Sequence, residues 1–187
     1  MRFLLVFVLL IVLTLNVSAA DYRGDCNIAF HGSSTLHDFH GKARCQPFTV
    51  NNIDGVMDIS KLSVAVADMD TDNSKRDKNM REMFEEKKHP LITSSAAVVP
   101  LKDIRATQKS GSSSSSKVTF TLMIRDVAKP VTATITNFAE TDSRITADVT
   151  FILSLADFLL KPPSVLGMIK VDDKVSVTAS FVLNATK

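Results

Sequence analysis

The stretch RITADVTFILS, residues 144–154, alternates between apolar side chains and mostly polar ones. The apolar members on one face are Ile145, Ala147, Val149, Phe151 and Leu153. Because successive side chains of a β-strand point to opposite faces, a period of two is typical of a half-buried strand, usually an antiparallel one. The stretch therefore predicts a strand with one face against an apolar interior.

Three other segments show the same alternation, at residues 61–68, 117–125 and 174–184. Their expected inward side chains are Leu62, Val64 and Val66; Val118, Phe120, Leu122 and Ile124; and Val175, Val177, Ala179, Phe181 and Leu183. Weaker strand candidates lie at residues 48–57, 95–99 and 131–135. Many short strands separated by turn residues predict an all-β sandwich or barrel. No internal repeat or change of composition divides the chain after residue 20, so a single domain is expected over residues 21–187.

One charged segment, residues 73–90 (NSKRDKNMREMFEEKKHP), departs from the alternation. Met80, Met83 and Phe84 have the i, i+3, i+4 spacing of a helix face. Ser74 followed by Asp77 can form a capping box, and Pro90 ends the segment. We expect a short amphipathic helix at about residues 74–88, lying across one end of the β structure. The serine-rich run at residues 109–117 is expected to be a long, flexible hairpin tip between strands.

Residues 1–20 have the features of a secretory signal peptide: Arg2, an apolar run at residues 3–15, and small side chains at Ser18 and Ala20. The alternative is a retained anchor, but the run is shorter than the roughly 20 residues of a membrane-spanning helix. Cleavage after Ala20 leaves 21 basic against 20 acidic residues, because Arg2 is lost from totals of 22 and 20. A nearly neutral chain lacks the concentrated basic surface that binding to nucleic acid needs. We therefore expect an exported protein that does not bind nucleic acid and has no transmembrane segment in the mature chain.

Two cysteines, Cys26 and Cys45, remain in the mature chain, and an exported protein can keep a disulfide. A hairpin whose turn is centred between Thr35 and Leu36 sets Cys26 opposite Cys45. A turn centred two residues earlier would set Cys26 opposite Gly41 instead, so the pairing of the two thiols depends on the register. If the bridge forms, loop closure would stabilise the fold by roughly 3 kcal/mol.

Three of the four histidines, His31, His37 and His40, lie in the stretch FHGSSTLHDFHGKARC, and the fourth is His89. One hypothesis is a metal-dependent or hydrolytic site around them. On an extended strand, however, His37 and His40 would point to opposite faces. The sequence also has no G-x-S-x-G elbow, glycine-rich phosphate loop or H-E-x-x-H motif. We therefore expect neither an enzyme nor a metal site.

Several segments together resemble the YceI-like family of exported bacterial proteins. The resemblance begins at FHGSSTLHDFHGKA and continues through residues 62–93, which hold Met69-Asp70-Thr71, Arg76-Asp77, a short helix and His89-Pro90. Its most specific part is the block of residues 70–90. The resemblance then continues through FTLMIRDVAKPVTATI, SLADFLL and VDDKVSVTASF. Two departures are Asp126, where the family commonly has glycine, and the serine-rich insert; they imply an altered turn and a longer loop.

This resemblance implies an extended, eight-stranded, antiparallel lipocalin-like β-barrel in the periplasm, often as a homodimer, with no enzymatic activity. It also implies that the interior holds a polyisoprenoid, isoprenoid quinone or fatty-acid-type lipid, for transport, storage or sequestration, with no other cofactor. An alternative is an interaction module with a packed barrel. The expected lining residues, taken from the alternating strands, the helix and the STLHDF motif, are Phe30, Phe39, Leu62, Val64, Val66, Met80, Met83, Phe84, Phe120, Leu122, Ile124, Val149, Phe151, Val177 and Phe181.

Overall fold

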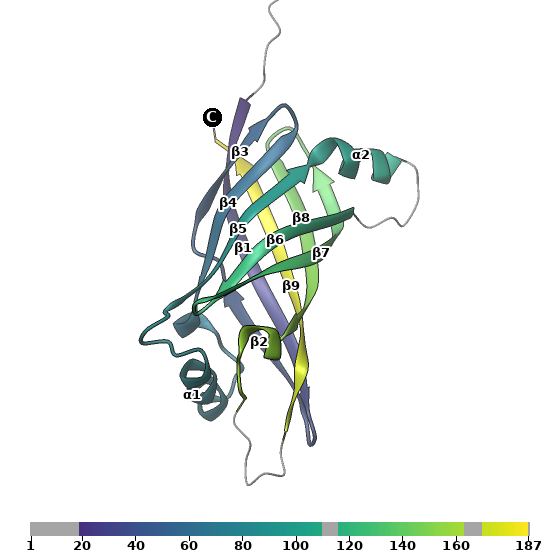
Figure 1. Cartoon of the computed structure of the whole chain (residues 1–187). Coiled ribbons are helices and arrows are strands. Elements are labelled where there is room, and N and C mark those ends of the chain that lie inside the picture. Colours follow the sequence, from purple (N-terminus) through teal and green to yellow (C-terminus); the bar gives the residue numbers. More distant parts are fainter. Residues whose placement is uncertain (1–18, 110–115, 163–169, 187) are drawn as a thin grey trace, which may run out of the picture.

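Nine antiparallel strands form one sheet that closes on itself in the computed structural model, which describes residues 19–109, 116–162 and 170–186 (Figure 1). The strands in this part of the chain are β1 (Ala19–Ser34), β2 (Asp38–Arg44), β3 (Phe48–Ile53), β4 (Val56–Ala65), β5 (Leu91–Pro100), β6 (Ser116–Ile124), β7 (Val127–Glu140), β8 (Arg144–Ser154) and β9 (Val171–Ala185). Neighbours in the sheet follow chain order from β3 to β9, and β9 pairs with β1 to close the barrel.

The long strand β1 explains how nine strands give a barrel with eight positions. One edge of β1 pairs with β9 from Tyr22 to Ser34. Along its other edge, β3 pairs with the first part of β1 and β2 with the last part. Because β2 and β3 lie end to end, they fill one position in the barrel, and the expected eight-stranded antiparallel lipocalin-like fold is confirmed.

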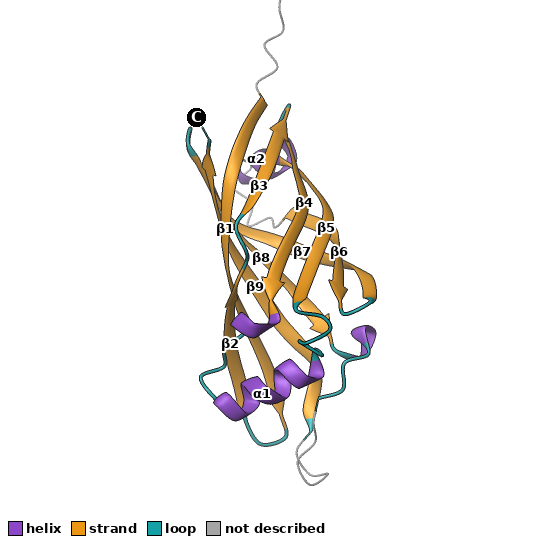
Figure 2. Cartoon of the chain, turned by 90° about the vertical axis from the view of Figure 1, so that its left-hand side faces the viewer, coloured by secondary structure: helices purple, strands orange, loops and turns teal. Residues whose placement is uncertain are grey.

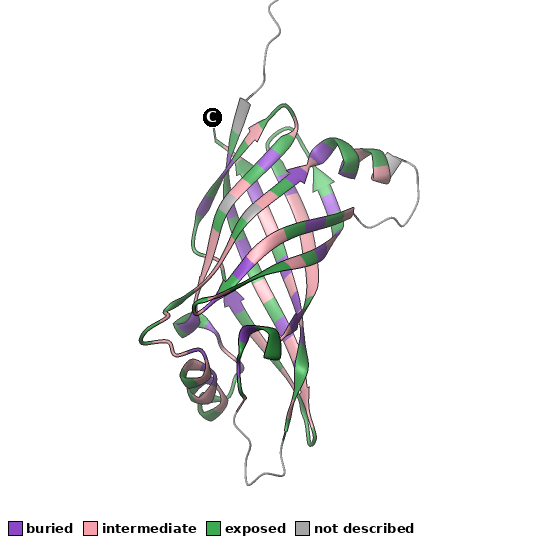
Figure 3. Cartoon of the chain, in the orientation of Figure 1, coloured by how far each residue is buried: buried purple, intermediate pink, exposed green. Residues whose placement is uncertain are grey.

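The alternation of apolar residues places them inside the barrel, and buried and exposed residues alternate along the strands (Figure 3). The register brings the inward side chains of neighbouring strands together: Phe151 lies opposite Val177, and Ala147 lies opposite Phe181. The weak candidate at residues 48–57 contains β3, a tight turn at Asp54 and Gly55, and the first two residues of β4. Both turn residues have positive φ, which explains the use of Asp-Gly at this hairpin.

The ladders between strands differ in length. β4 and β5 pair with each other from Val56–Pro100 to Ala65–Leu91. Among the described residues, β5 pairs with β6 only at residues 93–95, and β3 pairs with β4 only at residues 51–53. The β4–β5 pair therefore has a short ladder on each side.

Two α-helices of the described chain lie at opposite ends of the barrel, α1 (Ser74–Met83) near the lower end in the view of Figure 1 and α2 (Leu101–Lys109) near the upper end. Figure 2 shows α1 lying across the lower end of the barrel, as expected. The helix begins at Ser74 as predicted but ends at Met83, before Glu85, whose φ of 53° lies outside the helical region. Its N-cap is Asn73, which accepts a hydrogen bond from the Arg76 amide, so the predicted capping box of Ser74 and Asp77 is wrong.

Two further expectations need correction. The strand predicted at residues 61–68 stops at Ala65, and Val66 opens a short 3₁₀ turn, η1 (Val66–Asp68), in which the Val66 amide donates to the Pro90 carbonyl. Residues 109–117 were expected to be a hairpin tip between strands, but Lys109 is the last residue of helix α2. Residues 110–115 lie outside the described chain. Helix α2 was not predicted; it buries Leu101 and Ile104 over the upper end of the barrel (0% and 4% exposed).

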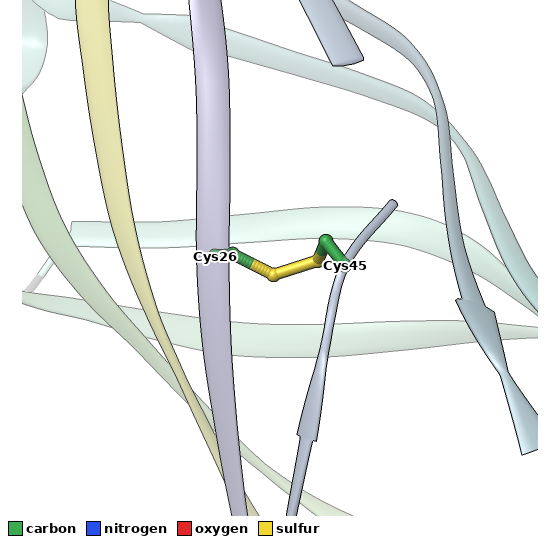
Figure 4. Close-up of a disulfide and its surroundings, with 2 residues drawn as sticks. All are labelled: Cys26 and Cys45. Atoms are coloured by element: carbon green, nitrogen blue, oxygen red, sulfur yellow. A yellow bond between two sulfur atoms is a disulfide. The ribbon is translucent and has the colours of Figure 1, made fainter. Parts of the chain in front are cut away.

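The disulfide between Cys26 and Cys45 is formed, with the two Cα atoms 5.2 Å apart (Figure 4). Ser33 lies opposite Asp38 and Asn27 opposite Arg44, so the turn is centred between Thr35 and Leu36. This is the register that favours the bridge; in the alternative register Gly41 would face Cys26, but it lies opposite Phe30.

The predicted signal peptide falls almost entirely on residues 1–18, which lie outside the described part of the chain; β1 begins at Ala19, so cleavage after Ala20 would remove its first two residues. Among the described residues, no helix has both the length and the apolar composition that crossing a bilayer requires.

Candidate ligand-binding cavity

The interior of the barrel is a cavity of about 650 Å³ that extends from α1 to α2. Side chains from every strand except β3 line it, together with residues of both α-helices. Its volume falls within the range of about 300–1,000 Å³ that is usual for small-molecule sites. The barrel is therefore not filled by its own side chains.

Fourteen of the fifteen predicted lining residues contact this cavity. They are Phe30, Phe39, Leu62, Val64, Met80, Met83, Phe84, Phe120, Leu122, Ile124, Val149, Phe151, Val177 and Phe181. The exception is Val66, which is 1% exposed and packs in a cluster with Met69 and Met80 but does not itself line the cavity. Since β4 ends at Ala65, Val66 no longer follows the alternation that the prediction assumed.

Several lining residues were not among the candidates. Met57 and Ile59 alternate with Asp58 on β4, and Ile28 precedes Phe30 by two residues, so the same period of two could have found them. Leu101 and Ile104 come from α2, and their i, i+3 spacing directly after Pro100 was the available signal. Cys26 and Cys45, which form the disulfide, also line the cavity.

Two apolar clusters form most of the cavity wall. One cluster, at the α2 end, includes Leu101, Ile104 and Phe138, and the other, at the α1 end, includes Met80 and Phe84. Three side chains pack against both clusters: Ile28, Phe120 and Phe151. The rings of Phe120 and Phe151 meet edge to face with centroids 5.5 Å apart, an arrangement that aromatic pairs prefer.

The α1 end carries a polar network that fixes the start of the helix. The Asp77 carboxylate is buried and accepts hydrogen bonds from the Thr71 amide (3.0 Å) and the Thr71 hydroxyl (2.5 Å). Arg76 donates from Nε to Thr71 Oγ1 (2.9 Å) and from Nη2 to the Thr71 carbonyl (2.8 Å). The Arg76 guanidinium also lies over the Phe39 ring, 5.5 Å from its centroid. The Arg76-Asp77 pair thus acts through Thr71, at a mouth that Thr71 and Arg76 themselves line.

The histidines do not converge on one point. His31 and His40 face each other across β1 and β2, with their Nδ1 atoms 3.1 Å apart, and neither lines the cavity. His37 lies at the cavity mouth, and His89 Nε2 is 3.7 Å from an Asp126 oxygen at the β6–β7 turn. In the part of the chain that the structure describes, no three His, Cys, Asp or Glu side chains are grouped as the ligands of a metal would be.

Solved structures with the same fold include proteins from three bacteria. BcnA from Burkholderia cenocepacia superposes with a TM-score of 0.60 at 18% identity, over 84% of this chain and 95% of BcnA. A polyisoprenoid binding domain from Saccharophagus degradans superposes with a TM-score of 0.58 at 14% identity, over 91% of this chain and 99% of that domain. The Campylobacter jejuni YCEI protein has a TM-score of 0.51 at 18% identity, over 73% and 75% of the two chains. No match to a curated protein was found. At these identities the likeness concerns the fold.

The family assignment rests on a separate comparison with family models. The model of the YceI-like domain matches residues 17–183, which is nearly the whole chain and includes all nine strands and both helices except the last residues of β9. The resemblance seen in the sequence is thereby confirmed, and the chain belongs to the YceI-like family.

Proposed function

We propose that the protein is an exported binding protein, not an enzyme, that holds one long apolar chain inside its barrel. The observation that carries the proposal is the cavity of about 650 Å³ whose walls are built almost entirely from aliphatic and aromatic side chains. Candidate ligands are a polyisoprenoid, an isoprenoid quinone or a fatty-acid-type lipid, carried, stored or sequestered in the periplasm. The Saccharophagus degradans neighbour, described as a polyisoprenoid binding domain, supports the same class of ligand.

The energetics of apolar burial are sufficient for such binding. Moving about ten methylene groups from water into the cavity gives roughly 8 kcal/mol before the costs of association. Binding that is driven by apolar burial needs few directed contacts, so a cavity wall without catalytic side chains is sufficient for it. The continuous cavity argues against the alternative of an interaction module with a packed barrel.

The experiment is native mass spectrometry of protein purified from its own host, followed by lipid extraction. We expect a bound apolar molecule, and delipidated protein should take up an isoprenoid or a fatty acid with a stoichiometry of one. Protein that carries no lipid and takes up neither probe would refute the proposal.

Export is tested separately on the same purified material. We expect the mature N-terminus to be Asp21 and the protein to be released with the periplasmic fraction. An intact Met1 in a cytoplasmic fraction would contradict export but leave lipid binding in place. Size-exclusion chromatography with light scattering tests the homodimer that we also propose.

A further inference from the structure

The charged side chains of the cavity lie at one end and have one sign. Among the described residues that line it, only Lys75 and Arg76 carry a full charge, and no aspartate or glutamate is present. Both residues belong to the first turn of α1. The opposite end, below α2, is lined by Leu101, Ile104 and Phe138. The cavity is therefore apolar at one end and cationic at the other.

No carboxylate of the described residues forms an ion pair with either of these two cations, Lys75 and Arg76. By contrast, Lys78, on the same helix, pairs with Glu82 (3.9 Å). Asp77 follows Arg76 directly in sequence, but its carboxylate accepts its hydrogen bonds from Thr71.

Arg76 is held in place by neutral partners. Its guanidinium donates to the Thr71 hydroxyl and carbonyl and lies over the Phe39 ring, so its position is fixed while its charge is retained. The structure gives Nη1 no hydrogen-bond partner among the described residues. Asn79 lines the same mouth and adds an uncharged amide beside the two cations.

We propose that this mouth binds the anionic headgroup, a carboxylate or a phosphate, of a single-chain amphiphile whose tail extends toward α2. Hydrogen bonds between Arg or Lys and an oxyanion are roughly twice as strong as those between neutral groups, and they gain further at the edge of an apolar cavity. The inference rests on the proposed function and adds the class of headgroup and the orientation of the ligand.

The test compares ligands that share a tail and differ in the headgroup. Palmitate is compared with hexadecanol, and geranylgeranyl phosphate with geranylgeraniol, by displacement of a fluorescent fatty-acid analogue from the delipidated protein. We expect the anionic member of at least one pair to bind about tenfold more tightly than its alcohol. A preference within the first pair alone identifies a carboxylate headgroup, and within the second pair alone a phosphate.

Substitutions test whether the preference for the anion over the alcohol arises at the mouth of the cavity. Lys75 is exposed and forms no hydrogen bond or ion pair with another described residue, so Lys75→Gln should reduce the anion-to-alcohol ratio several-fold without unfolding the protein. Arg76→Lys keeps the charge and should retain part of the ratio. The matched control is Lys78→Gln, which removes a cation from the same helix outside the cavity and should leave the ratio unchanged.

The outcomes separate the two proposals. Equal affinity for acid and alcohol in both pairs, or the same ratio in Lys75→Gln as in the unaltered protein, overturns the headgroup site and leaves lipid binding intact. If neither the anions nor the alcohols bind, the proposed function fails, and the headgroup site fails with it.

Discussion

Asp77 holds the start of α1 against the cavity mouth, because a single carboxylate oxygen accepts two hydrogen bonds from Thr71. The residue is 8% exposed, so removing the acceptor leaves the Thr71 donors without a partner in a site that water reaches poorly. We expect Asp77→Leu to lower the free energy of unfolding by about 1–3 kcal/mol. Urea denaturation followed by circular dichroism measures the change.

The control for this substitution is Asp77→Asn, which keeps a side-chain oxygen where Thr71 can donate to it. Asp77→Asn should therefore be less destabilising than Asp77→Leu. Equal losses for the two variants would mean that the negative charge, rather than the acceptor, stabilises this corner.

Ala147 is the smallest inward side chain of β8, so it leaves space in the part of the cavity that the cluster at the α2 end lines. Ala147→Trp would fill that space with an indole ring while the strand keeps its pairing with β9. We expect uptake of a long-chain ligand to be lost and the thermal midpoint to be retained. Thr146→Trp, one residue earlier and on the opposite face, should leave uptake unchanged. Normal uptake by Ala147→Trp would show that the ligand does not occupy the interior.

At the scale of elements, the disulfide joins β1 to the end of β2, across a loop with a sequence separation of 19 residues. Closing a loop of this length restricts the unfolded chain and is expected to contribute about 3 kcal/mol to stability. We predict that replacing Cys26 and Cys45 together by alanine lowers the free energy of unfolding by about this amount. The comparison is made by urea denaturation under non-reducing conditions, and an unchanged midpoint would contradict it.

The elements that could be predicted from sequence are those in which local pattern and tertiary position agree. Along β6 and β8, and along β9 from Val175 to Leu183, the apolar side chains keep a period of two, so the inward faces of these strands followed directly from the sequence. Val66 shows the limit: it continues the alternation of Leu62 and Val64, but a hydrogen bond from its amide to Pro90 draws the chain into a turn. That partner is distant in sequence and gives no local signal.

Helix α2 and the cationic mouth were missed for a related reason. Leu101 and Ile104 supply only one apolar turn, and what stabilises them is the open end of a barrel that exists only after folding. Arg76 was noted in the sequence, but its place at the cavity depends on Thr71 and Phe39, which other segments contribute. Sequence patterns give the composition of the wall, whereas the polar residues at its ends depend on tertiary contacts.

At the scale of the whole molecule, acid should destabilise the barrel. The Arg105 guanidinium, which donates to Glu140, lowers the pKa of that carboxyl below its ordinary value. Hydrogen bonds from Asn137 and then Ser180 lower the pKa of Asp148, and bonds from the Ala156 amide and the Ser154 hydroxyl lower the pKa of Asp173. A pKa that is lower in the folded state stabilises the fold above the ordinary carboxyl pKa of about 4 and ceases to do so as the pH falls through the lowered value.

We therefore predict that the urea midpoint falls as the pH decreases from about 5 to 3, because the unfolded chain binds protons that the folded carboxylates resist. Asp148→Asn removes one of these groups and should make the decrease less steep. A midpoint that stays constant or rises over this range would contradict the prediction.

The short ladders on either side of β4 and β5 make these two strands a panel in the barrel wall. The panel is joined to β3 at residues 51–53 and to β6 at residues 93–95. It is also joined to the residues after β2, because Val64 forms a bridge with Cys45 and the Gln46 amide donates to the Ser63 carbonyl. Helix α1 lies in the connection between the two strands of the panel. Hydrogen–deuterium exchange should consequently be faster in β5 than in β9, which is paired along most of its length on both edges. If the panel moved outward about the Asp54-Gly55 turn, it would open the barrel wall along the length of the cavity. A long apolar chain could then enter sideways instead of being threaded in from one end.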